Sequence, residues 1–163
     1  MSMKPVYLVE GKRTPHAKAG AQLKDIQAPF LGAYLVRHLL DNTNIKNDEV
    51  DEVIFGNTGT PAKYPNIGRV IALEAGLHKK TSGYSVHRNC ASGMEAVSQA
   101  YLKIASGRSD IIVAGGVESM SRAPFVMPKA DTAFTRANAV YEDLWAQDPS
   151  CYLSEQERNG NFS

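Results

Sequence analysis

Four short, mostly apolar runs are spaced along the first two-thirds of the chain. They are Val6–Val9, Val53–Gly56, Tyr84–His87 and Asp110–Ala114. Runs that are apolar along most of their length are typical of strands covered on both faces, as in α/β sheets. We therefore predict a strand at each run, with the third inside an extended segment over residues 81–88.

Helical patterns alternate with these runs. Apolar residues recur at helical spacing in three segments, so each helix is expected to carry an apolar stripe. The three stripes are Phe30, Leu31, Tyr34, Leu35, His38 and Leu39; Ile67, Val70, Ile71 and Leu73; and Met94, Val97, Tyr101 and Ile104. The alternation of strands and helices indicates a layered α/β domain rather than an α+β domain.

Capping residues mark the ends of the second and third helices. Asn66 is expected to cap the second helix, which stops at Gly76. Asn89 is expected to cap the third, which covers residues 91–106 and closes at Gly107. The third helix is therefore expected to begin directly after the extended segment over residues 81–88.

The regular pattern stops after Pro124. Residues 129–139 show no sustained period, and the tail from Ser154 onward is polar. We predict an α/β domain over residues 4–121, followed over residues 122–163 by the start of a loop insertion, irregular or truncated.

Composition narrows the range of functions. Hydrophobic residues make up 43% of the chain and charged residues 21%, as in ordinary globular domains. The formal net charge of +1 offers no basic footprint for nucleic acid or for an anionic membrane surface. No apolar run approaches the roughly 20 residues that span a bilayer, and the first residues lack the apolar core of a signal peptide. We expect a cytoplasmic protein without a nucleic-acid partner or a membrane span.

The stretch Asn89-Cys90-Ala91-Ser92-Gly93 carries the clearest chemistry. It places one cysteine where a predicted strand gives way to a predicted helix. Unpaired N–H groups and the positive dipole end at a helix start favour thiolate over thiol, so Cys90 can act as a nucleophile. The same N–H groups can hold the oxyanion that forms when a thiolate attacks a carbonyl. The junction therefore indicates acyl transfer.

Other interpretations of Cys90 are a buried, inert residue or a metal ligand. Burial is the commonest fate of a free cysteine. His87 precedes Cys90 by three residues, but two ligands are too few for a structural zinc site, so we predict no metal site. Cys151 has no comparable context and is expected to be structural, and two cysteines do not make a disulfide framework.

A second motif, Gly115-Gly116-Val117-Glu118-Ser119-Met120-Ser121, follows the fourth apolar run. Paired glycines after a strand permit close approach of another segment. Taken alone, the motif is explained more simply as a strand end and a tight turn, with Glu118 solvated.

Five motifs taken together point to one enzyme family. They are Arg13-Thr14-Pro15, Phe55-Gly56-Asn57, Asn66–Arg69, Asn89–Gly93 and Gly115–Ser121. In this order and spacing they closely resemble the N-terminal domain of the thiolases, the acetyl-CoA acetyltransferase and 3-ketoacyl-CoA thiolase family, over roughly residues 4–128. Residues 65–69 and 84–88 look somewhat closer to the β-oxidation thiolases. The resemblance implies a layered α/β domain with a mixed sheet between helices.

The resemblance also implies roles for individual residues. Cys90 matches the nucleophile that takes the acyl group from a 3-ketoacyl-CoA and passes it to a second CoA; the reverse cycle is a condensation of acetyl-CoA. The Cys90 N–H would contribute to an oxyanion hole, with Ser92 and Gly93 supporting it. His87 is interpreted as structural, because the family places its catalytic histidine elsewhere. Coenzyme A is then a substrate rather than a covalently bound cofactor, and a homodimer or larger oligomer is expected.

The chain departs from the family in one respect. Thiolases have a second, similarly folded domain with a Gly-His-Pro-containing motif and a Cys-Gly-Gly-containing motif, and neither motif occurs in this sequence. We therefore expect the C-terminal domain to be absent and the site to be incomplete alone. The chain would be a fragment, a truncated product, or part of a split enzyme with a separate C-terminal thiolase chain.

Two alternatives to an incomplete thiolase are a scaffold protein that keeps the fold and a related ketoacyl synthase. The motifs over residues 13–15 and 116–120 favour a thiolase over a synthase. An N-terminal half without its mate is also expected to expose an apolar face and therefore to self-associate or be unstable.

Overall fold

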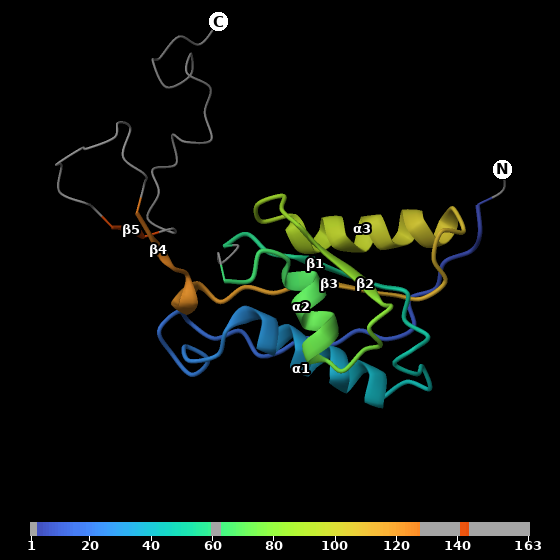
Figure 1. Cartoon of the computed structure of the whole chain (residues 1–163), viewed down its shortest axis with the longest axis horizontal. Coiled ribbons are helices and arrows are strands. Elements are labelled where there is room, and N and C mark those ends of the chain that lie inside the picture. Colours follow the sequence, from blue (N-terminus) through green and yellow to red (C-terminus); the bar gives the residue numbers. More distant parts are fainter. Residues whose placement is uncertain (1–2, 60–62, 128–140, 144–163) are drawn as a thin grey trace, which may run out of the picture. The chain divides into compact units, whose positions relative to one another are not determined.

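Three parallel strands form the central sheet of the chain (Figure 1). The computed structural model describes residues 3–59, 63–127 and 141–143. The sheet has the order β2-β1-β3, with β1 (Glu52–Gly56) between β2 (Ser82–Val86) and β3 (Ile112–Gly116). Glu52 lies opposite both Ser82 and Ile112, and the pairing continues in register to the last residue of each strand. The carboxyl ends of all three strands therefore meet at one edge.

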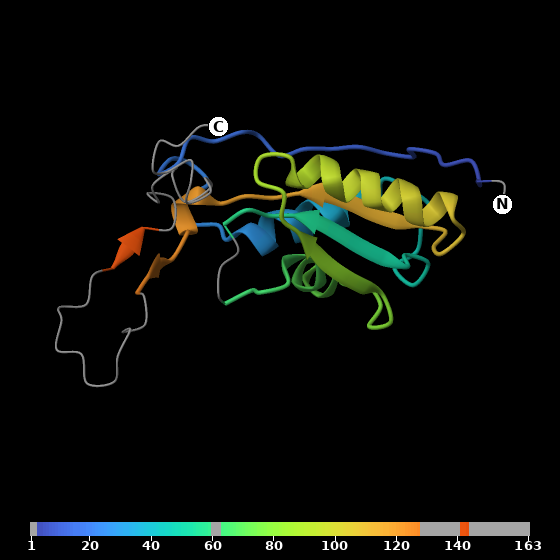
Figure 2. The same cartoon turned by 90° about the horizontal axis from the view of Figure 1, so that it is seen from above.

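Helices cover both faces of this sheet (Figure 2). α1 (Ala28–Asp41) and α2 (Ile67–Glu74) lie on one face, and α3 (Ser92–Ala105) lies on the other. Side chains alternate along β1, so Val53 and Phe55 join the core beneath α1 and α2, while Ile54 joins the core beneath α3. The predicted layered α/β arrangement is confirmed. The strands described for this sheet all run parallel, so an antiparallel strand of a mixed sheet is not among them.

One of the four predicted strands does not form. Residues 6–9 are within the described part of the chain and adopt no strand; Leu8 is 86% exposed. The nearby Lys4 N–H donates to the Ala105 carbonyl (2.9 Å), which attaches this segment to the end of α3. An apolar run becomes a strand only where a neighbouring strand pairs with it, and the described sheet leaves this run unpaired.

The predicted end signals of α2 are confirmed. Asn66 precedes the helix and its side-chain oxygen accepts a hydrogen bond from the Arg69 N–H (3.1 Å). Gly76 follows the last turn with φ of +80°, and Gly107 follows α3 with φ of +74°. Both angles lie in the left-handed region that glycine adopts without steric cost.

The helices do not all bury the stripes predicted for them. In α2, Ile67 and Ile71 are buried as predicted, whereas Leu73 is exposed. The other two helices bury faces made largely of small residues and turn large apolar residues outward. The buried residues are Ala28, Pro29, Gly32, Ala33, Val36 and Leu40 in α1, and Ser92, Ala96, Ala100 and Ala105 in α3. The prediction that these stripes form the buried faces of α1 and α3 is therefore wrong, because a helix that packs closely on its neighbours needs small side chains at the contact.

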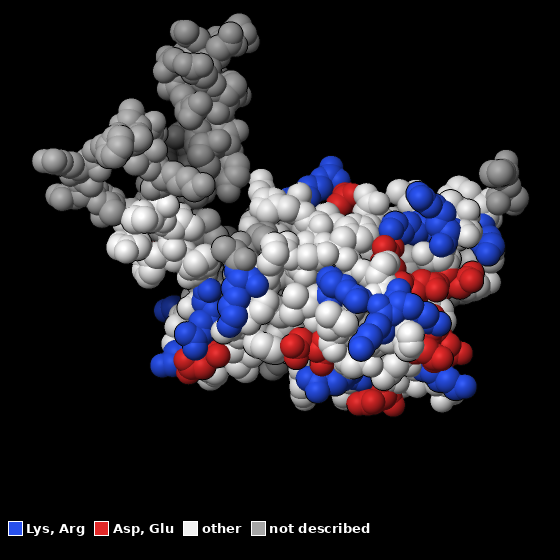
Figure 3. Space-filling view, in the orientation of Figure 1, with Lys and Arg blue, Asp and Glu red and all other residues white. Residues whose placement is uncertain are grey.

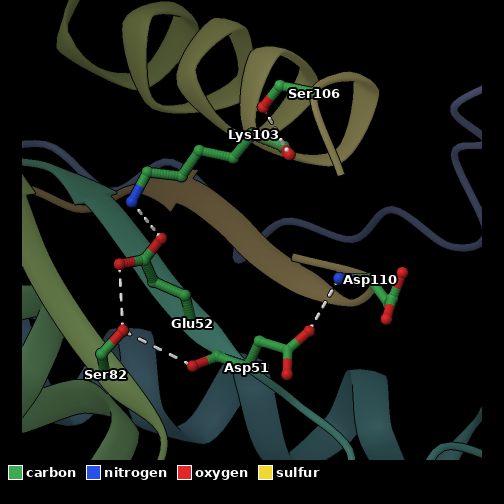
Figure 4. A network of polar contacts seen from close by, with 6 residues as sticks. All are labelled: Asp51, Glu52, Ser82, Lys103, Ser106 and Asp110. Atoms are coloured by element: carbon green, nitrogen blue, oxygen red, sulfur yellow. Dashed lines mark hydrogen bonds and ion pairs between the residues drawn. The ribbon is translucent and has the colours of Figure 1, made fainter. Parts of the chain in front are cut away.

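A polar network joins the amino ends of the strands to the last turn of α3 (Figure 4). The buried Glu52 carboxylate forms an ion pair with Lys103 and accepts a hydrogen bond from the Ser82 hydroxyl (2.9 Å). Lys103 Nζ also lies 4.7 Å from the centre of the Tyr84 ring. The neighbouring Asp51 carboxylate accepts hydrogen bonds from the N–H groups of residues 110 and 111 (2.8 and 3.1 Å). The polar contacts at this end of the sheet therefore stabilise the fold.

The chain divides into two compact units, residues 1–122 and 123–163. The short 3₁₀ turn η1 (Met120–Arg122) ends the first, and in the second β4 (Phe125–Val126) pairs antiparallel with β5 (Glu142–Asp143). Cys151 and most of the predicted loop insertion lie outside the described residues, so both interpretations stay predictions. None of the helices described is long and apolar enough to cross a membrane.

Candidate active site

The segments that follow the three strands are joined at the carboxyl edge of the sheet. The Asn57 N–H donates to the Val86 carbonyl (3.0 Å), and the Val117 N–H donates to the Gly56 carbonyl (3.0 Å). In open parallel sheets, ligands bind at this edge. The residues just after each strand are therefore candidates for a binding or catalytic site.

The Glu118 carboxylate organises the loop that follows β1. One oxygen accepts hydrogen bonds from the Asn57 side-chain amide (2.9 Å) and the Gly59 N–H (3.2 Å), and the other accepts from the Thr58 N–H (2.8 Å). The Asn57 amide also donates to the Val117 carbonyl (2.8 Å). Glu118 is exposed, as the simple interpretation expects, but it is more than a solvated turn residue, because its carboxylate accepts three hydrogen bonds.

A tight turn precedes α3 and carries Cys90. Asn89 has φ of +47°, and its carbonyl accepts hydrogen bonds from the Ser92 N–H (3.1 Å) and the Ser92 hydroxyl (2.6 Å). The Ser92 hydroxyl oxygen in turn accepts the Arg88 N–H (2.8 Å). The supporting role predicted for Ser92 has this structural basis: it closes the turn around Cys90.

The helix start differs from the prediction. α3 begins at Ser92, its N-cap position is Ala91, and no side chain caps it. The prediction of Asn89 as the cap is therefore wrong, because Asn89 takes the left-handed conformation of a turn instead. Cys90 lies two residues before the helix, with its side chain exposed and in no disulfide, so the interpretation of Cys90 as a buried residue is wrong.

Glycines bring the start of α3 onto the sheet beside this turn. A Cβ on Gly56 would lie 2.3 Å from the Ser92 carbonyl carbon, and a Cβ on Gly116 would lie 3.1 Å from Gly93 Cα. Gly93 lies in this contact as expected, but a Cβ of its own would meet Gly116 Cα at an ordinary 3.7 Å. The position that excludes a side chain is therefore Gly56, at the end of β1.

Electrostatic contacts attach the turn to the first turn of α3. The Glu95 carboxylate accepts a hydrogen bond from the Gln99 side chain (2.8 Å) and pairs with the Arg88 guanidinium (2.5 Å). These contacts, led by the Gln99 hydrogen bond, lower the pKa of Glu95 below its ordinary 4.5.

One buried acceptor at this edge has no partner. Asn57 is 2% exposed, and its side-chain oxygen accepts no hydrogen bond from any described residue. Buried polar atoms without a partner are rare, so a water molecule, a ligand or another part of the chain is expected to donate here. Asn57 belongs to one of the sequence motifs, but the sequence did not predict that its side chain is buried.

The structure does not bring a recognised acid or base to the cysteine. His87 is exposed between β2 and the turn, and the Cys90 thiol makes no hydrogen bond with the residues that the structure describes. Nor does any cluster of at least three His, Cys, Asp or Glu side chains within the described ranges have the arrangement of a metal site. Sequence reasoning missed that Thr58 contacts the turn and that Glu118 holds the loop of Asn57 and Thr58. The signal that these three residues share is that each closely follows a strand.

Comparisons with known proteins place this arrangement in a family. The thiolase N-terminal domain matches residues 6–160. The chain is 41% identical over 143 residues to a beta-ketoadipyl-CoA thiolase of Pseudomonas putida, covering 86% of this chain and 36% of that protein. It is 34% identical over 146 residues to a probable acetyl-CoA acyltransferase of Staphylococcus epidermidis, covering 90% of this chain and 37% of that one.

A solved structure agrees. The crystal structure of the Bacillus anthracis acetyl-CoA acetyltransferase matches with a TM-score of 0.71 and 31% identity, covering 76% of this chain and 32% of that one. The chain thus spans a little over a third of the length of the curated relatives named above, 36% and 37%. It belongs to the thiolase family, through that family's N-terminal domain.

Proposed function

We propose that Cys90 is the acyl-accepting nucleophile of a thiolase. The observation that carries the proposal is the exposed thiol, held in a hydrogen-bonded turn at the carboxyl edge of a parallel sheet, in a chain of this family. The relatives' names refer to CoA thioesters, and we infer that this chain acts on acyl-CoA and CoA as substrates without a covalently bound cofactor.

The proposed reaction has two halves. The Cys90 thiolate attacks the C3 carbonyl carbon of a 3-ketoacyl-CoA, the C2–C3 bond breaks, and its electron pair leaves on C2 as the enolate of acetyl-CoA. A proton taken up at C2 completes acetyl-CoA, and the acyl group stays on Sγ as a thioester. The thiolate of a second CoA then attacks that thioester and restores the Cys90 thiolate. The reverse sequence condenses two acyl units.

We propose that this chain does not complete the cycle alone. Protonation of C2 needs a positioned acid, and the described residues place none in hydrogen-bond contact with the Cys90 thiol. A C-terminal thiolase domain, in the same protein or in a separate chain, would supply it. Assembly into a homodimer or larger oligomer and a cytoplasmic location also stay predictions.

Acylation of Cys90 tests the proposal. The purified chain is incubated with acetyl-CoA, alone and with a candidate C-terminal thiolase chain, and acetylation is located by peptide mass spectrometry. We expect one acetyl group on Cys90 when the partner is present and none in Cys90→Ser, which keeps the size of the side chain. No acetylation in either arm would overturn the proposal and would favour the alternative, a non-catalytic assembly protein.

A further inference from the structure

We propose that Glu118 is a positioning residue for Cys90 and that it acts through Thr58 and Asn89. This inference rests on the proposed function, because it concerns how the chain holds the nucleophile. Glu118 and Cys90 are far apart in the sequence. The hydrogen bonds that link them join three segments, each of which follows a different strand.

The first link joins Glu118 to the loop after β1. The carboxylate accepts the consecutive N–H groups of Thr58 and Gly59 at 2.8 and 3.2 Å. It also accepts the side-chain amide of Asn57 at 2.9 Å, and Asn57 is buried. Both carboxylate oxygens are in use, so a single side chain fixes the backbone direction of this loop and hence the place of the Thr58 hydroxyl.

The second link joins Thr58 to the turn of the cysteine. The Thr58 hydroxyl donates to the Asn89 carbonyl at 3.2 Å, and that carbonyl belongs to the peptide bond that Asn89 shares with Cys90. Asn89 is the one non-glycine residue with positive φ among those described. A left-handed conformation costs free energy that surrounding contacts must offset. The Thr58 hydrogen bond supplies one such contact from outside the turn.

The positioning role requires a carboxylate at residue 118. A glutamine has one acceptor oxygen and an NH₂ group that would face N–H donors, so it cannot accept with both of its terminal atoms. The protein offers a natural comparison at the opposite end of the sheet. There Asp51 accepts the N–H groups of Asp110 and Ile111 and holds the start of β3, at the end of the sheet far from the cysteine.

The experiment compares four variants of the full chain. Glu118→Gln breaks the first link, and Thr58→Val removes the hydroxyl while keeping the shape of the side chain. Thr58→Ser keeps the hydroxyl and should rescue the second link. Asp51→Ala removes a carboxylate that also holds two N–H groups, which controls for lost stability and changed charge. Urea unfolding is measured for each variant so that all comparisons use folded protein.

Two rates are measured on each variant. The first is alkylation of Cys90 by iodoacetamide, with Cys151 of the same molecule as the internal reference. The second is acetylation of Cys90 by acetyl-CoA under the conditions in which the wild type reacts. We expect Glu118→Gln and Thr58→Val to slow acetylation at least about tenfold, because a small misplacement of a reacting group can cost up to about a hundredfold. Alkylation should slow by a smaller factor, because free iodoacetamide senses the turn only through the surroundings of the thiol. Thr58→Ser and Asp51→Ala should stay within about twofold of the wild type.

The outcomes separate this inference from the proposed function. If the wild type is never acetylated but the alkylation ratio follows the expected order, the proposed function fails and the positioning role stands. If folded Glu118→Gln and Thr58→Val react at wild-type rates, the positioning role is overturned while the proposed function survives. The positioning role is also overturned if Asp51→Ala slows Cys90 as much as Glu118→Gln does, since the effect would then be general loosening.

Discussion

Arg88 and Glu95 link the turn that carries Cys90 to the body of α3. The Glu95 carboxylate accepts a hydrogen bond from Gln99 one turn further along the helix and pairs with Arg88, two residues before Cys90. Both contacts favour the charged carboxylate, the Gln99 hydrogen bond most, so the pKa of Glu95 in the folded chain lies below 4.5.

This lowered pKa predicts a pH-dependent contribution to folding. Because the folded-state pKa is below the unfolded one, Glu95 stabilises the fold above pH 4.5, and this contribution disappears as the pH falls through the folded-state pKa. We expect Glu95→Gln to lower the urea midpoint near neutral pH, with the gap to the wild type closing in acid. Gln99→Met keeps the Glu95 carboxylate but removes its hydrogen-bond donor. In a Gln99→Met background, the difference in urea midpoint caused by Glu95→Gln should therefore be smaller. A gap that is constant with pH would contradict the prediction.

The cysteine could be located from sequence, but the contacts around it could not. A cysteine between an extended run and a helical run identifies the junction, and the surrounding motifs identify the family. The left-handed Asn89 and the hydrogen bond from Thr58 depend on a loop 31 residues away in the chain. No periodicity reports such a contact, and Asn at a helix start is as easily interpreted as a cap.

At the scale of the elements, the contact between α3 and the sheet is made by small residues. Ala96 and Ala100 pack on Ile54, and Gly56 and Gly116 face the first turn of the helix. Hydrophobic periodicity predicted the positions of the three α-helices and of the three sheet strands that the structure describes. It selected the wrong buried faces for α1 and α3, because it weights large apolar residues and does not register how closely two backbones approach.

Substitutions at two glycines test this close contact. Gly56→Ala would place a Cβ 2.3 Å from the backbone of Ser92, which cannot move without shifting α3. Overpacking of this kind costs about 1–3 kcal/mol or more. Gly93→Ala is the matched control: its Cβ meets Gly116 Cα at 3.7 Å, and alanine favours a helix by about 1 kcal/mol over glycine. We expect urea denaturation to show a clear loss for Gly56→Ala and little or no loss for Gly93→Ala; equal losses would contradict the packing described.

At the scale of the whole molecule, large apolar side chains remain on the outer face of α3. Met94 is 71% exposed, and Val97, Tyr101 and Leu102 are also exposed. The formal net charge is +1, and on the face in Figure 3 basic side chains lie beside acidic ones rather than in one patch. Neither the net charge nor a single-sign patch on this face therefore opposes contact between two copies.

This outer face predicts self-association of the chain in solution. Burying the apolar stripe of α3 against a second copy removes it from water. We expect the sedimentation coefficient of the wild type to rise with protein concentration. The double variant Met94→Lys/Tyr101→Lys should abolish most of that rise without loss of stability, because both side chains are exposed. Asn44→Lys, an exposed polar position in the loop after α1 and so away from α3, adds charge without touching the apolar stripe and should leave most of the association intact. A wild type that sediments as a monomer at every concentration would show that the exposed stripe does not drive assembly by itself.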